Sequence, residues 1–191
     1  MEDLNLLYER FQTKLQAVSG ESHRVKTLKE AEELIAQIMK EKGIESVAMV
    51  NSPMAEAMNL PEKLSAHGVT VYMERYPEVT PTVGAGITEV KWAVAELGTL
   101  IQYAEDVNER LCSSFTPIHI ALVQTSTLLP NLMTALATVH NEPRIPGFVG
   151  FITGPSRTSD IERVLTIGVH GPEQLVAVFV DEQAGEGVVN G

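Results

Sequence analysis

Two polar segments of the sequence carry the residue types that anion binding and acid–base chemistry require. The first, Gly154–Asp160, contains Ser156, Arg157 and Thr158. An arginine can hold a carboxylate or phosphate through two parallel hydrogen bonds, and backbone amides at the start of a helix also favour an anion. Because the apolar run Phe148–Thr153 comes just before, we expect the segment to leave a strand, enter a helix and bind a small carboxylate or phosphate.

Part of this segment also has a purely structural explanation. Ser159 and Glu162 have the spacing of a capping box, and Asp160 would lie in the first helical turn, where an acidic side chain is favoured. We therefore expect Ser159 and Glu162 to cap a helix. Ser156 and Arg157 lie before that cap and remain candidate ligand contacts, and Asp160 is kept with them among the candidate substrate-binding residues.

The second polar segment contains Glu96, Gly98 and Thr99, and it lies between the apolar runs Trp92–Ala95 and Thr99–Tyr103. A carboxylate that follows a buried strand can be partly desolvated, which suits a general base or a nucleophile. A glycine allows a ligand to approach the backbone closely, and the threonine adds a hydroxyl. Glu96 is therefore the candidate catalytic carboxylate, with Gly98 and Thr99 as candidate substrate contacts.

An ion pair is the structural alternative for Glu96. Its partner would be Arg110 or Arg157, and the pair would only fix the two loops. Arg110 is accordingly also a candidate substrate contact. The sequence leaves these alternatives open.

The histidines show no spacing typical of a zinc site, so we expect no bound metal. His119 begins an apolar run, and His170 precedes the turn Gly171-Pro172. A single histidine is often a hydrogen-bonded part of the scaffold. We nevertheless take His119 as a candidate substrate contact and His170 as a candidate catalytic residue, because its turn should leave the ring near an exposed edge. We predict that at least two of Glu96, Arg157 and His170 lie in one pocket.

Composition excludes several classes of function. A formal net charge of −11 argues against nucleic acid as the main partner. One cysteine, Cys112, can form neither an internal disulfide nor an iron–sulfur cluster, so we expect no cofactor bound by this chain. The N-terminus lacks the features of a signal peptide, and no stretch approaches 18 uninterrupted apolar residues. We expect a soluble, cytoplasmic protein without a membrane span.

The rhythm of apolar residues predicts the elements that position these side chains. Residues 1–20 read as an amphipathic helix that could cap the domain or pack on a partner subunit in a homo-oligomer, and residues 21–191 as a single α/β domain. A second helix should begin after Thr27, in a capping box with Glu30, and end at Gly43. Further helices are expected around Ala55–Met58 and over Leu128–Val139, and strands at Ser46–Val50, Val69–Met73, Trp92–Ala95, Thr99–Tyr103, His119–Val123, Phe148–Thr153 and Leu175–Val180.

Strands that alternate with helices predict a mainly parallel sheet with helices on both faces. Ligands of such sheets usually lie at the carboxyl ends of the strands. Both polar segments directly follow expected strands, and this locates the candidate site.

An ordered set of motifs runs over about half the chain. It consists of Gly86-Ile87-Thr88, Ala95-Glu96-Leu97-Gly98-Thr99-Leu100, Pro117-Ile118-His119-Ile120, Gly154-Pro155-Ser156-Arg157-Thr158-Ser159-Asp160-Ile161-Glu162 and Gly168-Val169-His170-Gly171-Pro172. This set resembles the LUD domain of the lactate-utilisation protein C (LutC/YkgG-type) family. The resemblance implies a fold similar to the sugar-phosphate isomerase and CoA-transferase (NagB/RpiA-like) superfamily. It also implies a role in oxidising lactate to pyruvate beside iron–sulfur partner proteins.

Three hypotheses of function follow. In the first, the chain is a non-redox subunit of a lactate-oxidising complex and its partners carry the iron–sulfur clusters. In the second, it is a stand-alone enzyme of the isomerase or CoA-transferase type that uses Glu96. In the third, it is a module that binds a small anion without turnover.

Overall fold

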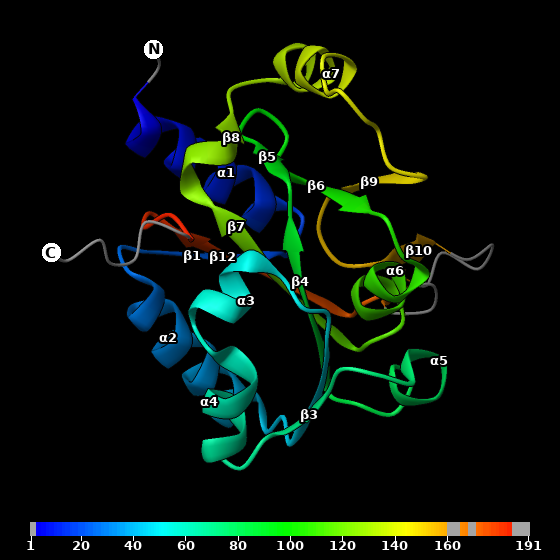
Figure 1. The fold of residues 1–191 in the computed structure, drawn as a ribbon. Helices are drawn as coiled ribbons and strands as arrows, with labels where there is room; N and C mark the ends of the chain where they lie inside the picture. Colours follow the sequence, from blue (N-terminus) through cyan, green and yellow to red (C-terminus); the bar gives the residue numbers. More distant parts are fainter. Residues whose placement is uncertain (1–2, 160–164, 168–170, 185–191) are drawn as a thin grey trace, which may run out of the picture.

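The structure is a computed structural model, and it describes residues 3–159, 165–167 and 171–184. Its centre is a six-stranded parallel sheet with strand order β1-β12-β7-β4-β2-β3, beside a four-stranded sheet of order β8-β5-β6-β9 (Figure 1). A separate two-stranded hairpin consists of β10 and β11. We call the first two the central sheet and the second sheet.

The bounds of the elements are as follows. The central sheet contains β1 (Glu21–Val25), β2 (Ser46–Met49), β3 (Thr70–Tyr72), β4 (Ala85–Val90), β7 (Ile118–Gln124) and β12 (Gln174–Val180). The second sheet contains β5 (Trp92–Val94), β6 (Thr99–Ala104), β8 (Leu128–Leu129) and β9 (Phe148–Ile152), and the hairpin contains β10 (Arg157–Ser159) and β11 (Leu165–Ile167). The helices are α1 (Leu4–Ala17), α2 (Leu28–Lys42), α3 (Pro53–Ala57), α4 (Leu60–Ala66), α5 (Tyr76–Val79), α6 (Val107–Ser114) and α7 (Leu132–His140), with a 3₁₀ turn at Thr125–Thr127.

Both faces of the central sheet are covered, as the sequence predicts. Successive side chains of a strand point to opposite faces, so Ile120 and Leu122 pack under α2, α3 and α4. Ala121 and Val123 point to the other face, where they contact α1 and the second sheet. A strand that is buried on both faces has a continuous apolar sequence, which explains why β7 could be predicted from the sequence.

Helix α2 forms as its local sequence dictates. Thr27 and Glu30 make the reciprocal hydrogen bonds of a capping box, and Gly43 ends the helix. Its buried stripe includes Ala31 and Ile35, which face the central sheet.

Helix α1 is part of the core on the opposite face. Phe11 and Leu15 are fully buried. The ring of Phe11 meets that of Phe179 on β12 edge to face, with 4.8 Å between the ring centroids. The N-terminal helix therefore packs on one face of the central sheet, where it also contacts the second sheet.

The second sheet corrects one expectation from the sequence. The segments Trp92–Val94 and Thr99–Ala104 pair antiparallel as a hairpin, and β9 runs antiparallel to β6. The link between β5 and β6 is too short for the crossover that parallel neighbours require. Glu96 and Gly154 therefore follow strands of the second sheet, and the rule about carboxyl ends of parallel strands does not apply to them.

One expected helix also begins later in the structure than the sequence predicts. The run Leu128–Val139 begins as β8, and α7 starts only at Leu132, after the N-cap Asn131. Ser159 belongs to β10, which pairs with β11, so a strand and not a helix N-terminus follows the turn at Gly154. The helix that Ser159 is predicted to cap would begin at residue 160, outside the described residues. Glu162 lies outside the described residues. The strands β1 and β4 and the helix α6 were not predicted from the sequence. Among the described residues, none of the helices combines the length and apolarity needed to span a membrane.

Replacing Phe11 with alanine should lower the free energy of unfolding by about 3–5 kcal/mol, because the fully buried ring would leave a cavity. Urea unfolding followed by circular dichroism measures this change. Leu6→Ala is the matched control, since Leu6 lies on the exposed side of the same helix and its loss should cost less than about 0.5 kcal/mol. Equal effects of the two substitutions would contradict the assignment of α1 to the core.

Candidate functional site

A cleft of about 410 Å³ lies between the second sheet, α6 and the turn before β12. It is the place where the polar segment after β9 meets the Gly171-Pro172 turn. The described residues that line it are Gln102, Ser113, Ser114, Phe148, Gly150, Phe151, Ile152, Thr153, Gly154, Ser156, Gly171 and Pro172. Among these described residues the polar groups are hydroxyl, amide and backbone groups, and none of the residues is charged.

Backbone hydrogen bonds hold the loop after β9 against the start of the central strands. The Ser156 N–H donates to the carbonyl of Pro172 at 2.8 Å, and the Glu173 N–H donates to the carbonyl of Pro117 at 2.8 Å. Pro117 and Glu173 precede β7 and β12 directly. The cleft therefore lies at the amino-terminal edge of these two parallel strands, opposite to the edge that the sequence led us to expect.

A buried glutamine joins the second sheet to α6 at the wall of the cleft. Gln102 is 1% exposed; its amide nitrogen donates to the carbonyl of Glu109 at 3.1 Å. The hydroxyl of Ser113 donates to the amide oxygen of Gln102 at 2.8 Å. Each of these bonds fixes one end of the amide, so the Gln102 side chain and the Ser113 hydroxyl present a defined orientation to the cleft.

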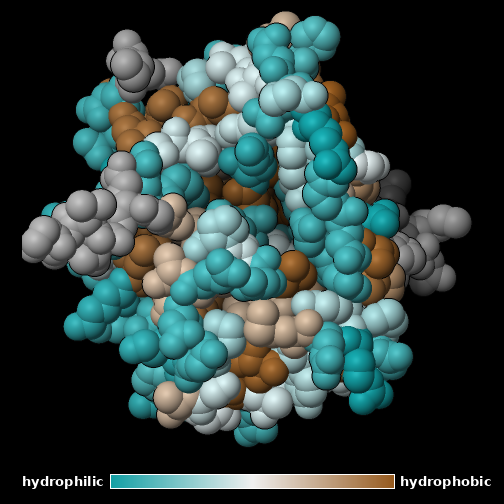
Figure 2. Space-filling model, in the orientation of Figure 1, coloured by the Kyte–Doolittle hydropathy of each residue, from teal (hydrophilic) through white to brown (hydrophobic). Residues whose placement is uncertain are grey.

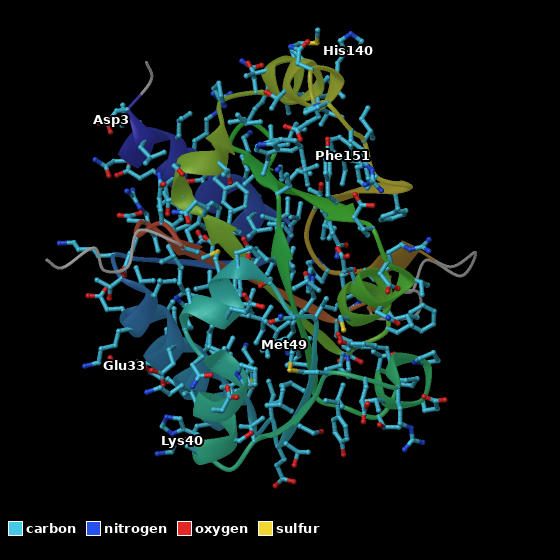
Figure 3. The ribbon with its side chains drawn as sticks, in the orientation of Figure 1. Asp3, Glu33, Lys40, Met49, His140 and Phe151 are labelled. Carbon is cyan, nitrogen blue, oxygen red and sulfur yellow. The ribbon has the colours of Figure 1, made fainter. Side chains whose placement is uncertain are left out.

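Strand β9 forms another wall, and the ring of Phe148 covers part of it. A Cβ added at Gly150 would lie 2.8 Å from the Cε1 atom of Phe148, so the Phe148 ring lies over this glycine. The guanidinium carbon of Arg110 is 5.1 Å from the centre of the same ring, a cation–π contact that places a positive charge beside the cleft. Phe151 also lines the cleft, and Figure 3 shows its side chain on the second sheet below α7.

Three of the predicted binding residues thus come together. Gly154 and Ser156 line the cleft, and Arg110 contacts Phe148 beside it. Thr99 is linked to it indirectly, because its hydroxyl lies 2.6 Å from that of Thr153, which is a lining residue.

Gly98 and Gly154 both lie where the second sheet approaches α1. Gly98 has φ +64°, and a Cβ there would lie 2.5 Å from the backbone nitrogen of Leu15. Gly154 has φ +74°, and a Cβ there would lie 2.8 Å from Cγ2 of Val18. Side chains other than hydrogen are disfavoured at both positions for two reasons, backbone conformation and space. These glycines let the two loops pack against the end of α1.

Glu96 has a partner in α7. One carboxylate oxygen accepts a hydrogen bond from the Leu132 N–H at 3.0 Å, and the Glu96 N–H donates to the carbonyl of Pro130 at 3.1 Å. A carboxylate at a helix N-terminus is stabilised by the unpaired amides and the helix dipole. Glu96 is not among the described residues that line the cleft.

His119 is buried completely inside the domain. Its Nε2 lies 2.8 Å from the Thr88 hydroxyl, and its Nδ1 has no hydrogen-bond partner among the described atoms. Burial lowers the pKa of His119 to about 4, because the apolar surroundings disfavour the charged ring. The neutral imidazole is part of the interior and is not among the described residues that line the cleft.

The remaining predicted residues are described only in part. The backbone of Arg157 and Thr158 belongs to β10, opposite Ile167 and Thr166 of β11, and their side chains lie outside the description. Asp160 and His170 lie outside the described residues. That two of Glu96, Arg157 and His170 share a pocket therefore stays a prediction.

Several lining residues were missed by the sequence analysis. Gln102 left a signal, since it is the one amide in the apolar run Thr99–Ala104. Ser113 and Ser114 left none, because α6 itself was not predicted. Phe148 and Phe151 looked like ordinary core residues of a strand, although 38% and 46% of their surfaces are exposed.

Comparison with known proteins identifies the family. The LUD domain profile matches residues 8–180, and the chain therefore belongs to the LUD domain family, as its motifs indicated. Its fold is also that of a crystal structure of a DUF162 family protein from Deinococcus radiodurans, with a TM-score of 0.64 and 18% sequence identity. The match covers 94% of this chain and 99% of that one.

Several relatives in sequence are named for lactate utilization. "Lactate utilization protein C 1" of Bacillus mycoides is 29% identical over 162 residues, which cover 79% of this chain and 69% of the relative. "Lactate utilization protein C" of Halalkalibacterium halodurans is 29% identical over 160 residues, with 80% and 70% covered. The protein of that name from an Exiguobacterium species is 41% identical over 101 residues, but only 51% of this chain and 44% of the relative are covered.

Gly98→Ala should lower the free energy of unfolding by more than about 1 kcal/mol, because the new methyl group combines a positive φ with a contact against α1. Gly147→Ala is the matched control, since a Cβ there meets nothing within 4 Å. Chemical unfolding of both variants gives the comparison. A Gly98→Ala protein as stable as Gly147→Ala would contradict the packing role of this turn.

The buried His119 makes stability depend on pH. The pKa of His119 in the folded state lies below the ordinary histidine value of 6.5, so the unfolded chain takes up a proton first as the pH falls. The neutral His119 ring contributes fully to the free energy of unfolding above pH 6.5. This contribution, roughly 3 kcal/mol, should be lost as the pH falls towards 4. Unfolding of the wild type and of His119→Gln between pH 7.5 and 4 isolates this loss, since other titrating groups act in both. His140→Gln, at an exposed position on α7, should retain the wild-type dependence.

Proposed function

We propose that this chain takes part in lactate utilisation, as a LUD-domain subunit that binds a small carboxylate and carries no electrons itself. The observation that supports the proposal most strongly is the family match over residues 8–180, together with relatives named for lactate utilisation. The cleft described above is the site that we assign to the ligand.

The chemistry of the cleft suits a small organic anion. In a chain of net charge −11, the described lining of this cleft contains no carboxylate that would repel such a ligand. Arg110 stands beside it, and no carboxylate of the described residues lies within ion-pair distance of its guanidinium. The hydroxyls of Thr153 and Ser156 can donate to carboxylate oxygens, and that of Ser113, whose proton is donated to Gln102, can accept from a 2-hydroxyl group.

A non-redox role fits the cysteine content. Oxidation of lactate to pyruvate releases two electrons and two protons, so an acceptor is required. Cys112, the single cysteine of the sequence, is buried, and burial raises the pKa of its thiol to about 12. A protonated, inaccessible thiol is a poor redox group, so we assign the electron acceptors to iron–sulfur partner proteins.

The alternative, turnover with Glu96 as nucleophile or base, has less support. The Glu96 carboxylate accepts a hydrogen bond from the Leu132 N–H at the start of α7, and Glu96 is not among the described residues that line the cleft. Binding at the cleft does not need this residue. Glu96→Gln separates the two hypotheses when affinity and turnover are both measured, because it should leave ligand affinity unchanged under the binding proposal and should abolish turnover under the alternative.

The ligand site can be tested by titration calorimetry of the purified chain with lactate and with pyruvate. Arg110→Gln should weaken binding roughly tenfold, because it removes a charge-assisted hydrogen bond. Arg10→Gln is the control, as Arg10 is an exposed arginine on α1, away from the cleft. Heat changes that are absent for both ligands, or equal affinity of the two variants, would argue against the assigned site.

The physiological role needs a test in the host. Deletion of the gene should impair growth on lactate as sole carbon source but not on glucose, and an affinity-tagged chain should recover iron–sulfur proteins from lactate-grown cells. Normal growth on lactate together with the absence of such partners would refute the proposal.

A further inference from the structure

The hydroxyl of Ser113, a residue of the cleft wall, has its proton engaged within the protein. It donates to the amide oxygen of Gln102, which also lines the cleft, at 2.8 Å. A second oxygen within reach is the backbone carbonyl of Arg110, at 3.2 Å, and it too can only accept a hydrogen bond. The one proton of this hydroxyl therefore goes to a protein acceptor, whichever of the two oxygens receives it.

The orientation of the Gln102 amide fixes this direction of donation. One end of the amide lies 3.1 Å from the backbone carbonyl of Glu109, which can only accept, so this end is the NH₂ group. The amide oxygen then lies toward Ser113 and cannot donate. Two oxygen atoms 2.8 Å apart need a proton between them, and only the Ser113 hydroxyl has one.

Toward a ligand, the Ser113 oxygen can therefore act only as an acceptor. A hydroxyl group has one donor and two acceptor sites, and no donor of the described residues is bonded to this oxygen. A ligand O–H group can donate to it, whereas a ligand carbonyl would bring a second acceptor against it. The Ser113 oxygen thus distinguishes a hydroxyl group from a carbonyl group.

Ser113 lies one helical turn from Arg110, the cation beside the cleft. Residues three apart on a helix are neighbours on one face, with about 5–6 Å between their Cβ atoms. The Arg110 guanidinium stands 5.1 Å from the centre of the Phe148 ring, and a guanidinium that stacks on a ring keeps its N–H donors free for a carboxylate. This spacing suits a ligand that carries an oxygen on the carbon next to its carboxylate.

The apolar part of the cleft strengthens the distinction between the two groups. Phe148, Gly150 and Ile152 line the same cleft, and Figure 2 shows hydrophobic residues on the right side of the molecule, at the height where Figure 1 places α6. Where water is partly displaced, two acceptors that meet without a proton lose the hydrogen bonds that water would otherwise make. A mismatched ligand is therefore disfavoured more strongly here than on an open surface.

We infer that the cleft selects a 2-hydroxy acid over the corresponding 2-oxo acid, an inference that rests on the proposed function of this site. The carboxylate binds Arg110, and the 2-hydroxyl group donates to Ser113. The 2-oxo acid lacks this proton and keeps only the carboxylate contact. In lactate utilisation the chain then holds the reduced acid and releases the oxidised one, and Gln102 and Ser113 determine this specificity.

Titration calorimetry of the wild type with three acids of the same chain length tests the inference. Lactate has a 2-hydroxyl group, pyruvate has a 2-oxo group and propionate has neither. We expect lactate to bind at least about tenfold more tightly than pyruvate, and more tightly than propionate, because only its hydroxyl finds the acceptor. Equal affinity for lactate and pyruvate would overturn the inference. Tighter binding of pyruvate would also overturn it, since the contacting group would then be a donor, such as the second N–H of Gln102.

Replacing Ser113 with alanine removes the acceptor. The affinities for lactate and pyruvate should then come within about twofold of each other, mainly through weaker binding of lactate. Ser65→Ala is the matched control, because the Ser65 hydroxyl also bonds a backbone carbonyl of its own helix, that of Pro61, and Ser65 is not among the described residues that line the cleft. A preference for lactate that survives in Ser113→Ala would contradict the role of this hydroxyl. Circular dichroism checks that the variants are folded, and the comparison of the three acids needs no substitution.

Arg110→Gln separates failure of this inference from failure of the proposed function. Under the proposed function, this substitution weakens the binding of lactate and pyruvate alike. If it does so while the wild type binds the two acids equally, the carboxylate site is correct and the preference for the hydroxyl is wrong. If none of the three acids binds to the wild type, the proposed function and the inference are overturned together.

Discussion

The arrangement of the domain depends on the packing of the buried stripe of α1 against the central and second sheets. Phe11 packs against Phe179 of the central sheet, and the end of the same helix receives the glycine turns of the second sheet. The helix thus fixes how far the second sheet stands from the central one. The distance between β9 and the start of β7 and β12, and with it the shape of the cleft, follows from this packing. The motif residue Gly98, which the sequence predicts as a substrate contact, is explained instead by the close approach of α1.

Elements with strong local signals could be predicted from the sequence. α2 has its capping box and terminal glycine, and β7 and β12 are continuous apolar runs of the kind that a sheet covered on both faces produces. The parallel sheet and its covering helices followed from these. The second sheet did not, because an apolar run does not reveal whether its partner lies parallel or antiparallel. The short link through Glu96 contained that information, since only a hairpin can be closed by so few residues.

The candidate site was predictable only in its loops. Gly154 and Ser156 were found because polar residues after an apolar run are conspicuous. Gln102 and Ser113 meet only through the packing of α6 on β6, and that contact is set by tertiary structure rather than by spacing. The polar groups of the cleft therefore come from segments far apart in the sequence, whereas the residues of the Glu96 turn are engaged in holding α7 and α1. Some motif residues of the family therefore stabilise the scaffold, and others line the cleft.

The burial of Cys112 gives the protein an internal reporter of its own opening. The Cys112 thiol is the only thiol in the sequence, and it is buried between α6 and the central sheet. The backbone carbonyl of Cys112 faces Gly86 of β4. An alkylating reagent can reach it only when this part of the domain separates, so the rate of modification measures the free energy of that opening. Ligands that bind the cleft beside α6 would slow this reaction, and the slowing would read out occupancy without any label.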